Sequence, residues 1–235
     1  MNESDSLPDG LGNSLFAGLN DSGGLMICGY EWGYSKSDSA ADLRGDAPID
    51  RPVPITFSNK VPRFGPIADT WPYDKRIKTW FRIWGNELNT EQSQRFDRCI
   101  VQTNWCNTQG HHILGGIKEK LATPENVENF ISRVSQLRPR LILFFGNQMI
   151  QVLQQPHLLN RIKEVCGPIV EPLEFPKVQF SGKRFKVGFQ SFESCKIVSL
   201  PHPSSSRGLT NDYISLFTPK IAPLIAEVKR SKACP

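Results

Sequence analysis

Three short segments combine a polar side chain with glycine, proline or aromatic neighbours, a pattern that suits catalytic loops. In the first, Glu31 lies between two aromatic residues that two glycines flank (residues 29–33, GYEWG). A carboxyl group in such a partly apolar setting has a raised pKa and can orient or deprotonate a water molecule. The alternative is a surface glutamate in a turn between packed aromatic residues, and the spacing alone favours that alternative.

The second segment places Asn104 among Thr, Trp and Cys (residues 103–107, TNWCN). An asparagine amide carries both donors and an acceptor, so it can read the edge of a base or of an amide-like ligand through two hydrogen bonds. A turn asparagine that bonds its own backbone has the same appearance. Both interpretations stay open.

The third segment (residues 201–208, PHPSSSRG) centres on His202, which two prolines flank. A histidine in a stiffened loop can stabilise negative charge that develops on a leaving group. The three serines that follow offer hydroxyl and amide groups to phosphate, and Arg207 adds a positive charge. A proline-rich turn with an exposed histidine is the simpler alternative.

Metal and cofactor chemistry have weak support in the sequence. His111 and His112 are adjacent, but no carboxylate or cysteine follows them at ligand spacing. The sequence contains no Walker loop, GxGxxG, GxSxG or HExxH motif. We therefore predict no metal and no cofactor.

Short apolar segments predict the elements that would position these side chains. Four of them are typical of buried strands: residues 24–29, 99–104, 141–145 and 195–200. Helical spacing of apolar residues falls between them, as in Ile77 to Leu88, in residues 124–137 after Thr123 and in residues 147–153. A last helix follows, and we expect Thr218 to be its N-cap. Residues 166–194 could form an antiparallel hairpin.

Strands that alternate with helices indicate an α/β fold. We predict a three-layer α/β/α sandwich around a central four-stranded parallel sheet. Ligands bind such sheets beyond the carboxyl ends of the strands. That rule selects the loops after Gly29, Thr103, Phe145 and Leu200, and three of these loops are the segments described above.

Length and composition are those of one globular domain. The chain has 235 residues, a formal net charge of +5 and 39% hydrophobic residues. We expect a loose leader at 1–23 and one domain at 24–235, with a long insertion at 34–63. An acidic N-terminus without a signal sequence and scattered cysteines favour a cytoplasmic monomer, and no apolar run is long enough to span a membrane.

The loops, in this order, resemble those of the uracil-DNA glycosylase superfamily, and are most similar to those of its single-strand-selective monofunctional branch. GYEWG takes the place of the first family motif, with Glu31 where the water-positioning Asp or Asn would be and Trp32 in place of the motif proline. His202 to Arg207 resembles the second motif, His-Pro-Ser, and that branch has an arginine at the sixth position. Residues 61–65 (VPRFG) and 137–147 also resemble family segments, whereas the clustered cysteines of the iron–sulfur branch are missing.

The resemblance implies a DNA glycosylase that hydrolyses the N-glycosidic bond of uracil or another deaminated base during base excision repair. The base would be flipped into a pocket. Glu31 would position the water, and His202 would stabilise the departing base. The implied base-binding residues are Gly29, Tyr30, Trp32, Gly33, Phe64 and Asn104. The implied DNA-binding residues are Ser204, Ser205, Ser206, Arg207 and Leu209, with Arg207 or Leu209 filling the vacated stack. The partner would be DNA, in the nucleoid or nucleus.

Two other functions remain open. A relative on the same fold could bind nucleic acid or protein without catalysis, and a third class would hydrolyse free nucleosides or nucleotides. A basic strip at Lys183, Arg184, Lys186 and Arg207 could contact DNA, or the lysines could belong to a solvated hairpin.

Overall fold

The computed structural model describes residues 22–33, 53–110 and 116–234. Residues 1–21 of the predicted leader, residues 34–52 of the predicted insertion and the histidine pair at 111–112 lie outside the described residues.

A mostly parallel sheet forms the centre of the molecule. Its strands lie in the order β3 (Ile100–Asn104), β1 (Leu25–Gly29), β5 (Leu141–Phe145), β8 (Lys196–Leu200), β7 (Gly188–Phe192) and β6 (Ile169–Glu174). The first four are parallel, and they are the four strands that the sequence predicts. The prediction of a four-stranded sheet is wrong, because the hairpin expected at 166–194 pairs antiparallel with β8 and extends the sheet to six strands.

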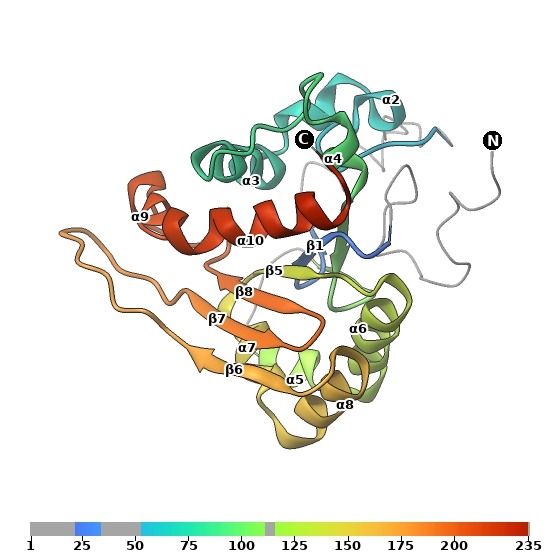
Figure 1. The fold of residues 1–235 in the computed structure, drawn as a ribbon, viewed down its shortest axis with the longest axis vertical. Helices are drawn as coiled ribbons and strands as arrows, with labels where there is room; N and C mark the ends of the chain where they lie inside the picture. Colours follow the sequence, from blue (N-terminus) through green and yellow to red (C-terminus); the bar gives the residue numbers. More distant parts are fainter. Residues whose placement is uncertain (1–21, 34–52, 111–115, 235) are drawn as a thin grey trace.

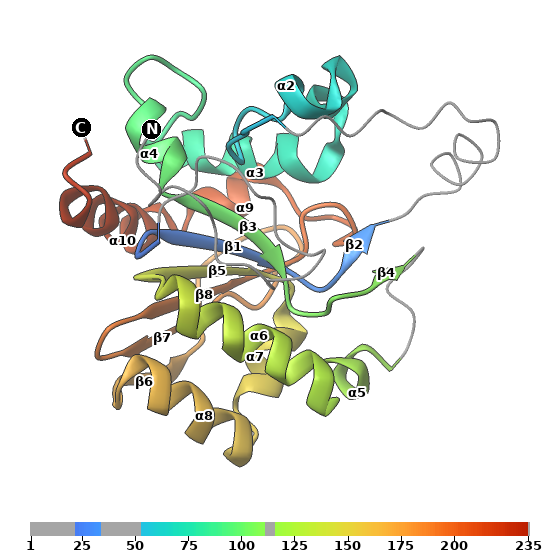
Figure 2. The same ribbon diagram turned by 90° about the vertical axis from the view of Figure 1, so that its right-hand side faces the viewer.

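Helices cover both faces of this sheet, as Figures 1 and 2 show. One face carries α3 (Pro72–Ile83), α9 (Asn211–Ser215) and α10 (Thr218–Ser231), and the other carries α5 (Ile117–Leu121), α6 (Pro124–Leu137), α7 (Asn147–Leu153) and α8 (Pro156–Cys166). Alternate strand residues enter the two cores: Ile27 and Leu143 face α3 and α10, whereas Met26 and Ile142 face α6 and α8. The α/β class with helices on both faces is confirmed.

Shorter elements complete the described part of the chain. They are α2 (Val61–Phe64), the 3-10 helix η2 (Pro66–Thr70), α4 (Gln94–Arg98) and a two-stranded parallel pair, β2 (Trp32–Gly33) with β4 (Gln109–Gly110). In the residues described, no helix has both the length and the apolar character that crossing a bilayer requires.

Two predicted helix boundaries are wrong. The helix expected to include Leu88 ends at Ile83, because Gly85 adopts a positive φ of 75° that stops it. Thr218 is the first residue of α10 rather than its N-cap, a position that Phe217 occupies. The start of α6 at Pro124, after Thr123, is as predicted.

Candidate functional site

The sheet reverses its strand order at β1. The chain passes from β1 to β3 on one side and then to β5 on the other. Open α/β sheets bind ligands at such a switch point, beyond the carboxyl ends of the strands. The loops after β1, β3, β5 and β8 therefore start at the edge where a site is expected.

The loops after β1 and β3 are paired along their length. The backbone N–H groups of Trp105 and Cys106 donate to the carbonyls of Gly29 and Tyr30, both at 2.8 Å. The pairing continues as β2 and β4, which extend past the main sheet (Figure 2). These contacts give the segments that carry Glu31 and Asn104 a fixed relative position.

Gly29 is in close contact with two polar side chains. A Cβ added there would lie 2.5 Å from Asn104 Oδ1 and 3.2 Å from the Tyr73 hydroxyl. Asn104 Nδ2 and the Tyr73 hydroxyl are buried and have no hydrogen-bond partner among the described residues. Buried polar groups without partners are costly, so this pair marks a place where polar atoms of a ligand or water would bind. Sequence reasoning identified Asn104 and missed Tyr73.

Tyr30 links three of the four loops. Its hydroxyl accepts a hydrogen bond from the backbone N–H of Gln148 at 3.0 Å, and a Cβ at Gly146 would lie 2.2 Å from its ring. Its ring also stacks parallel to that of His202, with centroids 6.1 Å apart. Burial raises the pKa of Tyr30 to about 12, so the phenol stays protonated.

His202 is held in one neutral tautomer. The backbone N–H groups of Ser204 and Ser205 lie 3.3 and 3.2 Å from Nδ1. Because backbone N–H groups only donate, Nδ1 must accept, and we assign the ring proton to Nε2. Burial lowers the pKa of His202 to about 4, which keeps the ring uncharged near neutral pH. The ring also lies 5.5 Å from that of Tyr73.

The loop that carries His202 is tied to α3. The Arg76 guanidinium donates to the carbonyl of Pro203 at 2.9 Å and to that of Leu209. Leu209 is only 6% exposed and packs in the core, which corrects the expectation that it could insert into DNA. Arg207, by contrast, is exposed.

Glu31 is anchored through one carboxylate oxygen. Oε2 accepts a hydrogen bond from Thr108 Oγ1 at 2.8 Å and pairs with Lys120. Oε1 has no hydrogen bond within the described residues, which leaves it available to accept one from water. No hydrogen bond or ring contact in that part of the chain joins Glu31 to His202 or Asn104, so the structure brings Glu31 to the same sheet edge without direct contact.

The remaining predicted base-binding residues lie around this edge. Trp32 is half-buried and Gly33 is exposed on β2. The ring of Phe64, at the end of α2, lies 5.4 Å from that of Trp71, with the Arg63 guanidinium 5.4 Å from its centroid. None of the ring contacts found in the described residues joins Phe64 to His202 or Tyr30.

A buried polar cluster lies on the same face of β3 as Asn104, and sequence reasoning missed it. Lys60, only 3% exposed, lies 2.5 Å from Asp74 Oδ2 and donates to Gln102 Oε1. Burial lowers the pKa of Lys60, and the Asp74 carboxylate opposes that shift. Gln102 is two residues before Asn104 on β3, so both side chains are on one face. The cluster joins the start of α2 to α3 and β3.

A second buried cation holds the backbone at Asn104 from the opposite face of the sheet. Arg133 of α6 donates to Thr103 Oγ1 at 2.9 Å and to the carbonyl of Asn104 at 2.5 Å. Asn129 Nδ2 donates to the next carbonyl, that of Trp105, at 2.6 Å. Burial lowers the pKa of Arg133 to about 10. These contacts make Asn104 one of the most firmly positioned residues of the site.

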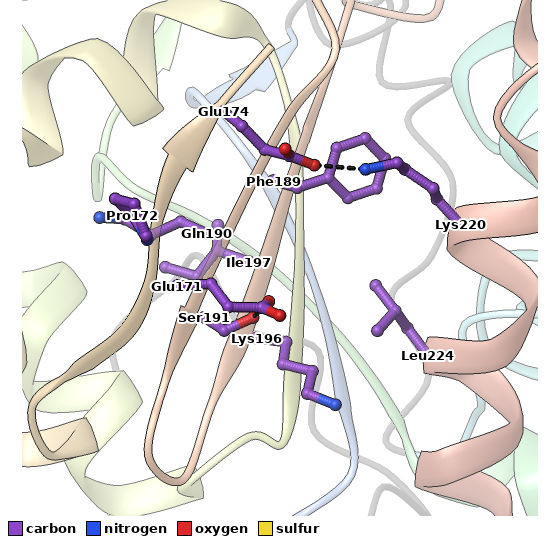
Figure 3. A pocket seen from close by; sticks show the side chains of 10 residues that line it. All are labelled: Glu171, Pro172, Glu174, Phe189, Gln190, Ser191, Lys196, Ile197, Lys220 and Leu224. Atoms are coloured by element: carbon purple, nitrogen blue, oxygen red, sulfur yellow. Dashed lines mark hydrogen bonds and ion pairs between the residues drawn. The ribbon is translucent and has the colours of Figure 1, made fainter. Parts of the chain in front are cut away.

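A groove of about 480 Å³ lies elsewhere, between β6, β7, β8 and α10 (Figure 3). The ion pair between Glu174 and Lys220 crosses it. None of the predicted site residues lines this groove.

Replacing Gly29 with alanine is expected to lower the free energy of unfolding by about 1–3 kcal/mol, the usual cost of overpacking. The added methyl group would displace the buried side-chain amide of Asn104, whose own backbone is fixed by β3 and by the hydrogen bond from Arg133 to its carbonyl. Urea denaturation measures the change. Gly33→Ala is the matched control, because a Cβ there meets nothing within 4 Å. Equal stability of the two variants would contradict the contact.

Comparisons with known proteins add no family to this description: no family model matches the chain, and no curated protein matches it. The described residues also contain no group of three or more His, Cys, Asp or Glu side chains that could hold a metal ion.

Proposed function

We propose that the protein is a monofunctional DNA glycosylase that releases uracil or another deaminated base. The observation that carries the proposal is the neutral imidazole of His202, fixed with its proton on Nε2 beside two tyrosine rings. The hydroxyl of one of these, Tyr73, lies close to Gly29, as does the Asn104 amide, whose Nδ2 has no partner among the described residues. A fixed neutral donor suits a leaving group that becomes anionic, because the donor needs no reorganisation during the reaction. The motif resemblance points to the same chemistry.

In the proposed reaction, water adds to C1′ of the deoxyribose as the bond between C1′ and the base nitrogen breaks. The electron pair of that bond leaves with the base. His202 Nε2–H donates to the base oxygen on which negative charge develops. Oε1 of Glu31 accepts a hydrogen bond from the attacking water and takes the proton that the water loses, which later neutralises the released base. Lys120 and Thr108 hold the other oxygen.

Base recognition is assigned to the polar atoms around Gly29. Asn104 supplies a donor and an acceptor, and the Tyr73 hydroxyl supplies a further donor. Extrusion of the base from the DNA brings its polar edge to these atoms. Ser204, Ser205 and Ser206 are assigned to phosphate, with Arg207 in the vacated stack.

The test is base release from single-stranded and duplex oligonucleotides that carry one uracil, hypoxanthine or xanthine. Alkali then cleaves the strand at each abasic site. We expect cleavage with the wild-type protein and about 10²-fold less with Asn104→Ala, because the base edge loses its partner. Tight binding of uracil-containing DNA without base release would favour the non-catalytic alternative. Activity on free nucleosides but not on DNA would favour the third class.

A further inference from the structure

The segment between β6 and β7, residues 175–187, extends away from the sheet past α9 (Figure 1). It contains Lys177, Lys183, Arg184 and Lys186 and no acidic residue. All four basic side chains are exposed. The segment therefore presents a concentrated positive charge on a chain whose formal net charge is only +5.

This segment is attached to the body of the protein through its apolar side chains. The rings of Phe180 and Phe185 lie 5.2 and 5.9 Å from that of Tyr213. The Tyr213 hydroxyl donates to the carbonyl of Phe185. Since the apolar side chains face the protein, the charged side chains of the same segment are left on its outer surface.

The charges on this segment have no acidic partners within the described residues. Neighbouring lysines differ in this respect: Lys220 pairs with Glu174, and Lys196 pairs with Glu227. A row of exposed cations without counter-charges is the usual footprint of a phosphate backbone.

The segment also contacts the loop that carries His202. Lys183 Nζ donates to the carbonyl of Arg207 at 3.1 Å. A Cβ at Gly208 would lie 3.3 Å from Lys183 Cδ, so the two segments are in close contact at Lys183. Arg207 therefore continues the row of positive charge toward the candidate site.

We infer that residues 175–187 form an arm that binds the phosphates of the DNA strand next to the extruded base. The inference rests on the proposed function for the identity of the nucleic acid. The arm is expected to contact the backbone rather than the bases, because the rings of Phe180 and Phe185 pack against Tyr213 and the basic side chains are exposed without acidic partners among the described residues. It therefore adds affinity without sequence preference and makes binding depend on salt.

The experiment measures the affinity for uracil-free DNA by fluorescence anisotropy between about 50 and 200 mM salt. The test variant is Arg184→Gln with Lys186→Gln. The control is Arg140→Gln with Arg230→Gln, which removes two exposed charges from residues outside the arm. Thermal denaturation checks that both variants are folded.

The arm variant is expected to bind about 10-fold more weakly and to lose about 1.4–1.8 from the slope of log affinity against log salt, or 0.7–0.9 for each lost phosphate contact. The control should stay within about twofold of the wild type. An arm variant with wild-type affinity and slope would overturn the inference, as would equal losses in the control or a wild-type protein that binds no DNA.

The two proposals fail in different ways. Because the DNA carries no uracil, this binding does not depend on catalysis. If the wild type releases base and the arm variant binds DNA normally, the arm proposal is contradicted and the proposed function stands. If the arm variant loses binding and the wild type releases no base, the proposed function is contradicted and the DNA-binding arm stands.

Discussion

Replacing His202 with alanine is expected to lower the rate of base excision by about 10²–10³-fold, the cost of removing one donor from a site of developing negative charge. The imidazole is fixed by two backbone N–H groups on Nδ1 and lies against two tyrosine rings. Single-turnover excision from a uracil-containing oligonucleotide measures the loss. The matched control is His157→Ala, on the exposed surface of α8, which should retain the wild-type rate.

The pH dependence of the same reaction gives an independent readout. With a pKa of about 4, His202 is neutral throughout the range from about pH 6 to 8, so its protonation contributes no change in rate there. A fall in the wild-type rate as the pH drops through about 6.5, absent in His202→Ala, would contradict the assignment of His202 as a neutral donor. So would a His202→Ala rate within about threefold of the wild type.

Replacing Lys60 with methionine is expected to lower the free energy of unfolding by about 3–5 kcal/mol. The change leaves the Asp74 carboxylate buried without its cation and removes a donor from Gln102. Adding Asp74→Leu should restore part of the loss, because two apolar side chains can replace a buried ion pair at little net cost, whereas the buried Gln102 amide still lacks its two partners. Urea denaturation of the single and double variants measures both effects.

A less buried pair between η2 and α3 provides the control for Lys60. Lys78 of α3 lies 3.6 Å from Asp69 of η2, whose side chain is 62% exposed. Lys78→Met should cost less than about 1 kcal/mol, as exposed ion pairs usually do. A Lys60→Met variant as stable as Lys78→Met, or a double variant no better than Lys60→Met alone, would contradict the structural role of the buried pair.

The parallel strands could be predicted from the sequence because each is a short, continuous apolar run. Strands β6 and β7 were harder to place: β6 is largely exposed and contains Pro172, so its pattern indicates a hairpin but not its membership of the main sheet. The end of α3 depended on Gly85, whose backbone conformation is evident only in the structure.

The candidate site was predictable where a polar residue directly follows a strand, as with Asn104 and His202. Tyr73, Lys60 and Asp74 belong to α3 and to the segment before α2, which fold back over the strand ends from other parts of the chain. No local spacing links them to Asn104. The one signal in the sequence for this cluster was Asp74, an acidic residue on the otherwise apolar face of a helix. It was ambiguous, because an aspartate near the start of a helix is also stabilised by the helix dipole.

The role expected of Leu209 failed for a related reason. The position of Leu209 just past the histidine motif matched the resemblance. However, the Arg76 guanidinium bonds that part of the loop to α3, and the Leu209 side chain is buried in the core. Arg207, two residues earlier, remains exposed beside Lys183. Burial of an apolar side chain therefore decided between the two residues.

The measurement that tests the central claim most directly is the detection of free base by mass spectrometry after the protein acts on single-stranded DNA with one uracil. The account predicts one free uracil for each abasic site formed, an intact phosphate backbone before alkali, and loss of both products in His202→Ala. Folded wild-type protein that releases no uracil, hypoxanthine or xanthine from DNA would contradict the proposed glycosylase. Base release that persists in His202→Ala would contradict the assigned site.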